Sequence, residues 1–201
     1  MRWAAFTARG AAMDPWNGMG RRAATDREIT SLRERLRRDP AGDHLSTALE
    51  FRERLGGRTG AVLSVRVDPA RFFPPEAEPF DAALKIFDLE DPAARGRMAE
   101  EVELLQDLQH KRICQLVGVV STLSRREAAL LLEYLPGGDL RHLLHTCRVA
   151  LPLPHGLNMA RQICSRLAYL HALERAHLAL LVGHVLLDMS LNVKLCSLGG
   201  Q

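Results

Sequence analysis

Apolar and polar residues alternate, or gather in short runs, across the first part of the chain, a pattern that predicts strands. Residues 49–67 (LEFRERLGGRTGAVLSVRV) combine β-branched residues with glycines, which indicates a strand, a glycine turn and a second strand. A third strand is expected at 82–87 (AALKIF), and two more at about 114–123 and 128–134, separated by the polar turn SRRE. These stretches predict a sheet of short strands.

Helical spacing of apolar residues predicts three helices in the rest of this region. Residues 94–109 form the first, the turn PGGD leads into the second, and the third follows the proline-rich linker VALPLPHG. The buried faces of the second and third are expected to hold Leu140, Leu143, Leu144 and Cys147, and Ala160, Ile163, Leu167 and Leu170, respectively. The apolar runs VLLD and VKLC then have the length of a hairpin.

The amino-terminal residues have a different character. Residues 1–25 contain several arginines and few acids, which favours a disordered tail, with an organelle transit peptide as the alternative. Thr25 and Glu28 have the spacing of a capping box, and the apolar positions behind them predict an amphipathic helix over 26–38. This helix either packs on the neighbouring domain or is offered to a partner. Asp39, Pro40 and Gly42 end it.

Charge and cysteine content narrow the function classes. The 27 basic and 24 acidic residues are interspersed, so the net charge of +3 does not point to a nucleic-acid partner. The four cysteines lie far apart with no C-x-x-C pair, which argues against a zinc site or a disulfide framework and for a reduced, cytoplasmic setting. The most apolar stretch, 178–187, has about half the residues that a membrane span needs and contains His184.

Lys85 and Glu101 are both charged residues at positions where the surrounding pattern is apolar. Lys85 stands inside an apolar strand, and Glu101 stands on the apolar face of the first helix, with Leu104, Leu105 and Leu108. Each charge would be costly to bury alone, so an ion pair between the two is expected.

The order of these features resembles the amino-terminal lobe and the first part of the carboxy-terminal lobe of protein kinases. LGGRTGAV is similar to the glycine-rich loop, Lys85 to the strand lysine that holds phosphates, and Glu101 to its helix partner. In LLLEYLPGGDLRHLL, Leu132 takes the gatekeeper position and Glu133 to Leu135 the hinge, with a lean towards tyrosine-kinase and tyrosine-kinase-like groups. LGGRTGAV departs from the family pattern, with one residue fewer between its first glycines and Thr59 where an aromatic is common.

The resemblance implies an α+β fold, with a small antiparallel-sheet lobe carrying one main helix and then the first helices of an incomplete helical lobe. The implied divisions are a tail at 1–25, a helix and linker at 26–48, the first lobe and hinge at 49–135, and the partial second lobe at 136–201. The chain stops just after Ser197-Leu198-Gly199, before an activation segment. An apolar face of the third helix is therefore expected to lie exposed or to be covered by a protein partner.

The positions that carry kinase chemistry are altered. Aligning HLALLVGHVLLD on the catalytic loop H-R-D-L-x-x-x-N places Ala179 at the aspartate that accepts the substrate proton and His184 at the asparagine that binds magnesium. Ser197 replaces the metal-binding aspartate of D-F-G. The resemblance thus implies that no residue is catalytic and that magnesium has no acidic ligand at these positions. His177 and His184 are interpreted as core residues rather than metal ligands.

The resemblance implies a pseudokinase-like scaffold or interaction module, with ATP bound, if at all, without magnesium. The residues implied for the nucleotide are Leu55, Gly56, Gly57, Gly60, Val62, Lys85, Glu101, Leu132, Glu133 and Leu135. For Lys85 and Glu101 the alternative is a purely structural ion pair. Two alternative functions stay open, an ATP-dependent kinase that uses Asp188 or Glu133 in unorthodox roles, and an inactive truncated product. Partners are expected to be proteins, bound through the exposed second-lobe face or the helix at 26–38.

Overall fold

The computed structural model describes residues 49–56, 61–68, 78–108, 113–124, 126–147 and 150–197. Several predictions lie outside these residues, including the tail at 1–25, the helix at 26–38 and the continuation of the S-L-G motif beyond Ser197. Gly57 and Gly60 of the glycine turn also lie outside them.

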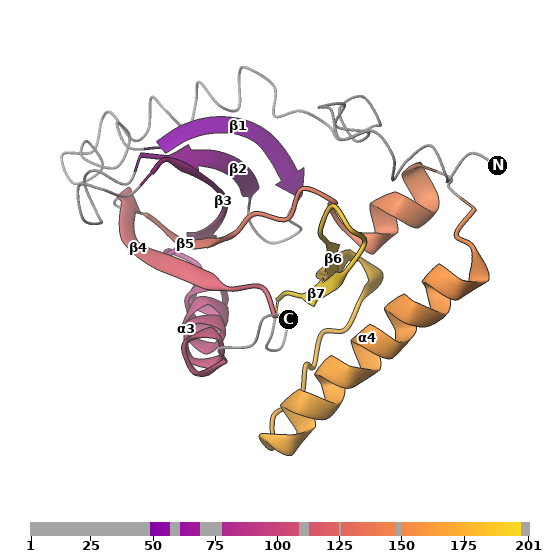
Figure 1. The fold of residues 1–201 in the computed structure, drawn as a ribbon. Helices are drawn as coiled ribbons and strands as arrows, with labels where there is room; N and C mark the ends of the chain where they lie inside the picture. The colour runs from indigo at the N-terminus through magenta and orange to yellow at the C-terminus, as the bar shows by residue number, and fades with distance from the viewer. Residues whose placement is uncertain are drawn as a thin grey trace.

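A five-stranded antiparallel sheet forms the first lobe (Figure 1). Its strands are β1 (Leu49–Gly56), β2 (Val62–Val67), β3 (Phe80–Asp88), β4 (Leu116–Ser124) and β5 (Glu127–Glu133), in the order β1-β2-β3-β5-β4. All four neighbouring pairs are antiparallel. The predicted strands and the antiparallel lobe are confirmed.

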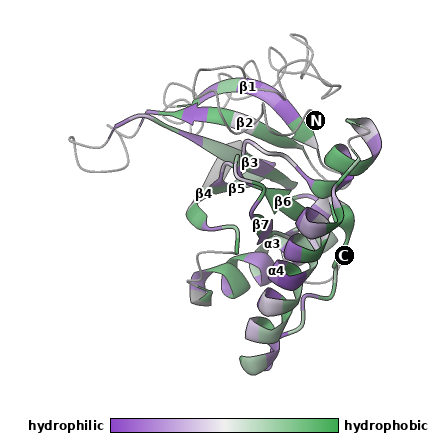
Figure 2. Ribbon diagram, turned by 45° about the vertical axis from the view of Figure 1, so that its right-hand side comes forward, coloured by the Kyte–Doolittle hydropathy of each residue, from purple (hydrophilic) through white to green (hydrophobic). Residues whose placement is uncertain are grey.

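Apolar and polar residues alternate along β1, so that one face of this strand packs on the core. Leu49 and Phe51 are buried while Glu50 and Arg52 are exposed, and Figure 2 shows this change from hydrophobic to hydrophilic along the strand. The inner strand β5 reads EAALLLE and is buried on both faces between its ends. A core of apolar residues from β1, β2, β3 and β5 stabilises one face of the sheet.

Helix α3 (Pro92–Asp107) covers the other face, where its residues contact β3 and β4. Its start follows local rules: the Asp91 carboxylate accepts a hydrogen bond from the Ala93 amide, and proline occupies the first turn. Leu105 and Leu108 are buried, as the apolar stripe predicted. The helix thereby turns Glu101 towards the sheet, and the Glu101 side chain is only 4% exposed.

The second lobe begins with a short helical segment that includes a π-helical turn, His142–Thr146. Helix α4 (Leu153–Ala172) and the hairpin of β6 (Val185–Leu187) and β7 (Val193–Leu195) follow, which confirms the predicted hairpin. The expectation that Leu144 is buried was wrong, because it is 37% exposed. Leu140 and Leu143 do lie in the core.

The predicted buried face of α4 was wrong in part. Ala160 is exposed, and the buried residues are Met159, Gln162, Arg166 and Leu170. Because two of these four residues are polar, apolar periodicity alone does not indicate this buried face. Burial is tolerated because the Gln162 side-chain oxygen accepts a hydrogen bond from the Val193 amide at 3.0 Å, and the Arg166 guanidinium donates to the Gln162 carbonyl. Ile163 and Leu167 pack at the margin of the core.

Part of the apolar surface of α4 and of the loop after it is exposed, as the resemblance implied. Leu153 is 73% exposed, Leu157 61% and Leu178 76%. Smaller exposed fractions occur at Leu173, Leu180, Leu181, Val182 and Met189. Among the described residues, no helix is long and apolar enough to cross a membrane.

Backbone contacts tie the hairpin to both lobes (Figure 1). Ile113 forms a parallel bridge with Leu195, and the Cys114 amide donates to the Leu195 carbonyl at 2.9 Å. On its other edge, the hairpin pairs with the segment after β5 through a bridge between Asp139 and Leu186. The hairpin therefore lies between the sheet and α4.

Candidate functional site

Lys85 and Glu101 meet where β3 faces α3. The Lys85 Nζ lies 2.5 Å from Glu101 Oε2, with side chains 21% and 4% exposed. Nζ also lies 3.5 Å from the Ser197 hydroxyl and 5.3 Å from the centre of the Phe87 ring. The predicted ion pair is confirmed, and the structure adds Ser197 and Phe87 as further contacts of the ammonium group.

Apolar side chains from both lobes gather beside this ion pair. One cluster brings together strand, hinge and hairpin residues, among them Leu55, Val62, Ala83, Leu132, Leu135, Leu186 and Cys196. Leu55, Val62, Leu186 and Cys196 are only partly buried. Gly56 lies at the exposed end of β1, close in sequence to this wall. Of the implied site residues, Leu55, Val62, Leu132 and Leu135 belong to this cluster, which we call the apolar wall, and Lys85 faces its Phe87 ring.

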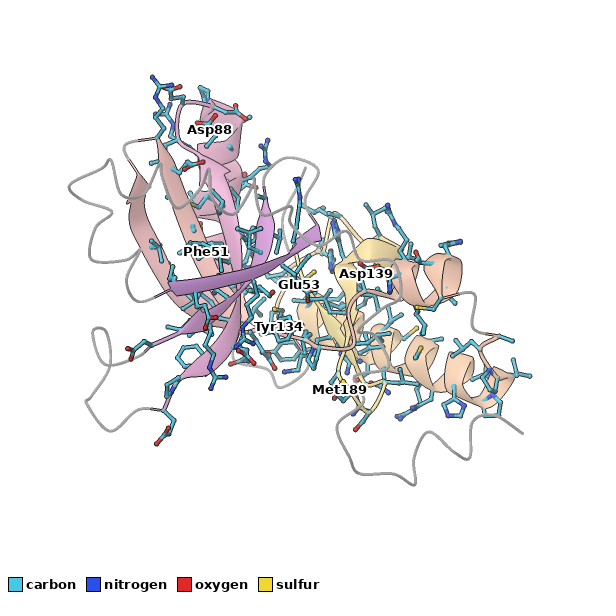
Figure 3. All side chains as sticks on the ribbon, turned by 90° about the horizontal axis from the view of Figure 1, so that it is seen from above. Phe51, Glu53, Asp88, Tyr134, Asp139 and Met189 are labelled. Atoms are coloured by element: carbon cyan, nitrogen blue, oxygen red, sulfur yellow. The ribbon has the colours of Figure 1, made fainter. Side chains whose placement is uncertain are left out.

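The hinge segment is fixed by its side chains. Glu133 Oε1 lies 2.5 Å from Lys194 Nζ of β7, and Glu133 Oε2 accepts a hydrogen bond from the Gln115 amide at 3.4 Å. The Tyr134 hydroxyl donates to Glu53 Oε1 of β1 at 3.4 Å, and Figure 3 labels both residues where β1 approaches the hinge. Lys194 was not predicted as a contact of the hinge, although it lies inside a short apolar strand as Lys85 does.

The three altered catalytic positions lie on the loop and hairpin of the second lobe. Ala179 is buried and offers only a methyl group. His184 Nδ1 lies 2.6 Å from the Ala179 carbonyl oxygen, and Ser197 takes a left-handed backbone conformation with φ 55°. In the described part of the chain no three His, Cys, Asp or Glu side chains cluster as metal ligands would. A methyl, an imidazole and a hydroxyl do not suit magnesium, which prefers carboxylate oxygens.

Asp188 and Glu133, the candidates for unorthodox catalysis, already have structural partners. Asp188 Oδ1 accepts hydrogen bonds from the Ser190 and Asn192 amides, each at 2.8 Å, and its Oδ2 accepts one from the Asn192 side chain. This arrangement closes the turn between β6 and β7. Glu133 is paired with Lys194. Both carboxylates therefore hold the hairpin in place.

His177 is buried at the start of the catalytic-loop equivalent. It is 3% exposed, and neither ring nitrogen has a hydrogen-bond partner among the described residues. Burial, reinforced by repulsion from His184, lowers the pKa of His177 below its ordinary value of 6.5. The side chain packs as a neutral imidazole, which fits the interpretation of a core residue.

The lowered pKa of His177 predicts acid sensitivity. Below pH 6.5 the unfolded chain binds a proton at His177 that the folded chain does not, so the free energy of unfolding falls as the pH drops through this range. The slope contributed by one such group approaches about 1.4 kcal/mol per pH unit. Urea unfolding at pH 7.5, 6.5 and 5.5 should show a shallower loss in His177→Gln than in the wild type.

The matched control for this measurement is His171→Gln, which removes an exposed histidine at the end of α4. It should keep the wild-type slope. Equal slopes for His177→Gln and the wild type would contradict the buried neutral imidazole.

Two thiols lie at the inner side of the apolar wall. Burial raises the pKa of Cys196 to about 12, and burial likewise raises the pKa of Cys114 well above its usual value. Both are neutral thiols at physiological pH and make poor nucleophiles. The site therefore contains no reactive cysteine at either position.

The rate of alkylation should distinguish Cys164 from Cys114 and Cys196. With iodoacetamide at pH 8, we expect Cys164, exposed on α4, to react while Cys114 and Cys196 stay unmodified until the protein is denatured. Peptide mass spectrometry reads out each position. Cys164→Ser should remove the rapid label, whereas modification of Cys196 as fast as that of Cys164 would contradict the raised pKa of its thiol.

Comparison with known proteins places this geometry in a family. The chain is 38% identical over 111 residues to "Salt tolerance receptor-like cytoplasmic kinase 1" of Oryza sativa subsp. japonica, an alignment that covers 50% of this chain and 30% of that protein. It is 34% identical over 120 residues to "Maternal embryonic leucine zipper kinase" of Danio rerio, covering 58% of the chain and 17% of that protein. "Probable serine/threonine-protein kinase drkC" of Dictyostelium discoideum is 28% identical over 117 residues, covering 57% and 15%.

The chain thus spans less than a third of the length of each of these relatives. A match to a family model covers far more of the chain, from residue 49 to residue 199, and takes in both lobes, the hinge and the hairpin described above. The chain belongs to the family "Protein tyrosine and serine/threonine kinase".

Proposed function

We propose that this chain is a pseudokinase-like module that binds an adenine ligand without magnesium, transfers no phosphate and acts by binding protein partners. The observation that carries the proposal is the chemistry at Ala179, His184 and Ser197. Phosphoryl transfer depends on a positioned base and on metal ions that neutralise developing charge. A buried methyl group and a hydroxyl supply neither.

The adenine part of the proposal is supported by the surviving apolar wall. Leu55, Val62 and Leu186 are partly exposed members of one cluster with the hinge residue Leu135, as a flat aromatic base requires on its two faces. The hinge is held rigidly by the Glu133–Lys194 pair, so its backbone is pre-organised for a ligand.

The interaction part of the proposal is supported by the exposed leucines at and after α4. Leu153, Leu157 and Leu178 are each more than half exposed, and apolar patches on protein surfaces commonly mark interaction sites. We place this role in the cytoplasm, on the sequence argument from unpaired cysteines. The assignment to a tyrosine-kinase-like group stays a prediction.

The test combines binding and transfer in one preparation. Thermal unfolding is followed with ATP in excess EDTA and with ATP and magnesium, and radiolabelled phosphate transfer to the chain and to a generic peptide is measured in parallel. We expect ATP to raise the melting temperature equally in both buffers and no phosphate to be transferred. Leu186→Ala should reduce the shift, whereas Leu191→Ala in the same hairpin, outside that wall, should not.

Phosphate transfer that is abolished by Lys85→Arg, a change that keeps the charge of the ion pair, would overturn the proposal and favour the kinase alternative. The relatives named as kinases are the observation behind that alternative.

A further inference from the structure

We propose that the amphipathic helix predicted at residues 26–38 docks on the outer side of α3 in the same chain, over a hollow between the ends of α3 and α4. The inference goes beyond the proposed function, because it uses neither the adenine ligand nor the altered catalytic positions. It follows from the shape and charge of this surface and from where the chain enters the sheet.

The hollow lies where the ends of α3 and α4 approach each other (Figure 1). It has a volume of about 200 Å³ and is lined by Leu104, Leu108, Leu173 and Arg175. Leu108 is 4% exposed and Leu173 is 45% exposed, so apolar surface leads from the interior out to the solvent. Sites for drug-sized molecules begin near about 300 Å³. The smaller hollow suits the leucine side chains of a docked helix instead.

An acidic border adjoins the hollow on α3. Glu100, Leu104 and Leu108 follow one another at intervals of four residues, so they lie along one side of the helix. Glu100 is exposed at the outer end of this row, and Glu103 is exposed beside it. The row therefore changes from carboxylate to leucine as it approaches the hollow.

The other described charges around the hollow do not offset these two carboxylates. Arg95 and Arg97 belong to the first half of α3, and Arg97 pairs with Asp91 at 3.4 Å. On the second lobe, Glu174 and Arg175 follow each other in the chain and carry opposite charges. Within the described residues, the rim is thus apolar with a net negative side on α3.

The segment 26–38 carries the complementary pattern. Ile29, Leu32 and Leu36 recur at i, i+3 and i+7, the spacing of anchors on a helix that binds in a groove. Arg33 and Arg37 each follow a leucine and lie four residues apart, so they border the stripe on one side. Five basic and three acidic residues give this segment a net charge of +2. The leucines can enter the hollow while the two arginines face the carboxylates of α3.

The sheet register brings this segment to the correct end of the first lobe. Strand β1 begins at Leu49, and the pairing carries this end across β2 to Phe80 at the start of β3. The hinge end of β5 and the start of β4, which follows α3 in the chain, lie at the same end. The sheet is about 19 Å wide from β1 to β4, at about 4.8 Å per strand. Residues 39–48 can span about 33 Å when extended, so the helix can reach α3.

The test is the binding of a fluorescent peptide of residues 24–40 to the full chain, followed by anisotropy. A helix on a short linker reaches an effective concentration of about 1 mM, so a peptide Kd of about 100 µM would keep the tethered helix docked about nine tenths of the time. Leu36→Asp in the chain should vacate the hollow. This vacated variant should bind the wild-type peptide about tenfold more tightly than the wild-type chain does.

Ser31→Asp is the matched control, because it adds the same charge on the opposite side of the predicted helix. It should bind the peptide as weakly as the wild type does. Equal affinities of the wild type and Leu36→Asp for the peptide, or no binding by either, would overturn the inference.

Charge reversal tests the acidic border. In the vacated variant, Glu100→Lys with Glu103→Lys should weaken peptide binding at least about tenfold. A peptide with Arg33→Glu and Arg37→Glu should restore it. Glu90→Lys changes an exposed charge before α3 and should alter neither affinity. Unchanged binding in the reversed chain, or a loss that the reversed peptide does not restore, would contradict the contact.

Two further measurements identify the occupant. Light scattering should give the same mass for the wild type and Leu36→Asp, whereas a dimer that this change dissociates would assign the hollow to the helix of a second copy and overturn the proposal. Lys111 and Arg112 follow Leu108 outside the described residues. In the vacated variant, Lys111→Gln with Arg112→Gln should bind the peptide no more weakly, and a loss of binding would overturn the charge argument.

Discussion

Replacing Lys85 with methionine is expected to lower the free energy of unfolding by about 3 kcal/mol, the lower end of the cost of removing one partner from a buried ion pair. Methionine fills much of the same space, so the loss is electrostatic. It leaves the Glu101 carboxylate, 4% exposed, without its counter-charge. Chemical denaturation followed by circular dichroism at neutral pH measures the loss.

A double variant distinguishes the destabilisation caused by an unpaired buried charge from that caused by altered packing. Lys85→Met combined with Glu101→Leu removes both charges and should recover most of the stability, because no unpaired charge stays buried. Glu90→Gln breaks the exposed pair with Arg126, whose side chains are 59% and 73% exposed, and should cost less than about 1 kcal/mol. A double variant as unstable as Lys85→Met alone would contradict the ion-pair account.

Gly137→Ala should be the second damaging change, because the turn after the hinge passes close to the backbone of β6. A methyl group at Gly137 would lie 2.5 Å from the Leu187 carbonyl oxygen and 2.6 Å from that of Asp188. Backbone atoms cannot move aside as a flexible side chain can, so the turn must separate from β6. It would then strain the hydrogen bond from the Leu187 amide to the Gly138 carbonyl.

We expect Gly137→Ala to cost at least about 2 kcal/mol, as overpacking of a rigid site does. It should also reduce the rise in melting temperature that ATP in EDTA produces, since the hinge and Leu186 would separate. Gly96→Ala in α3 is the control, because nothing lies within 4 Å of its added methyl, and it should stabilise the helix by about 0.5–1 kcal/mol. Equal melting temperatures for the two variants would show that the turn accommodates the methyl.

The sequence allowed most of the fold to be predicted, because each element carries its own local signal. Alternation in β1, the apolar run of β5 and the stripe of α3 are properties of neighbouring residues. The Lys85–Glu101 pair was also predictable, because each charge contradicts the apolar pattern around it. The resemblance to kinases supplied the hinge and the altered catalytic positions.

Features that depend on distant partners were not predicted. Gln162 and Arg166 are buried because Gln162 reaches the Val193 amide and Arg166 reaches the Gln162 carbonyl, and polarity alone predicts exposure for both. The Lys194–Glu133 pair joins residues 61 positions apart, and Glu133 was assigned to the hinge instead of to an ion pair. The π-helical turn His142–Thr146 likewise has no pattern that apolar spacing alone would detect.

The contacts of the hairpin formed by β6 and β7 determine which segments should unfold together. Through Ile113, Cys114 and Lys194 it is joined to the sheet, so it should exchange its amide hydrogens together with the first lobe. Helix α4 is joined to the hairpin mainly along the Gln162 and Leu170 side, and its opposite face is open to water. The boundary between cooperative folding units would then fall inside the second lobe, between the hairpin and α4, instead of at the hinge.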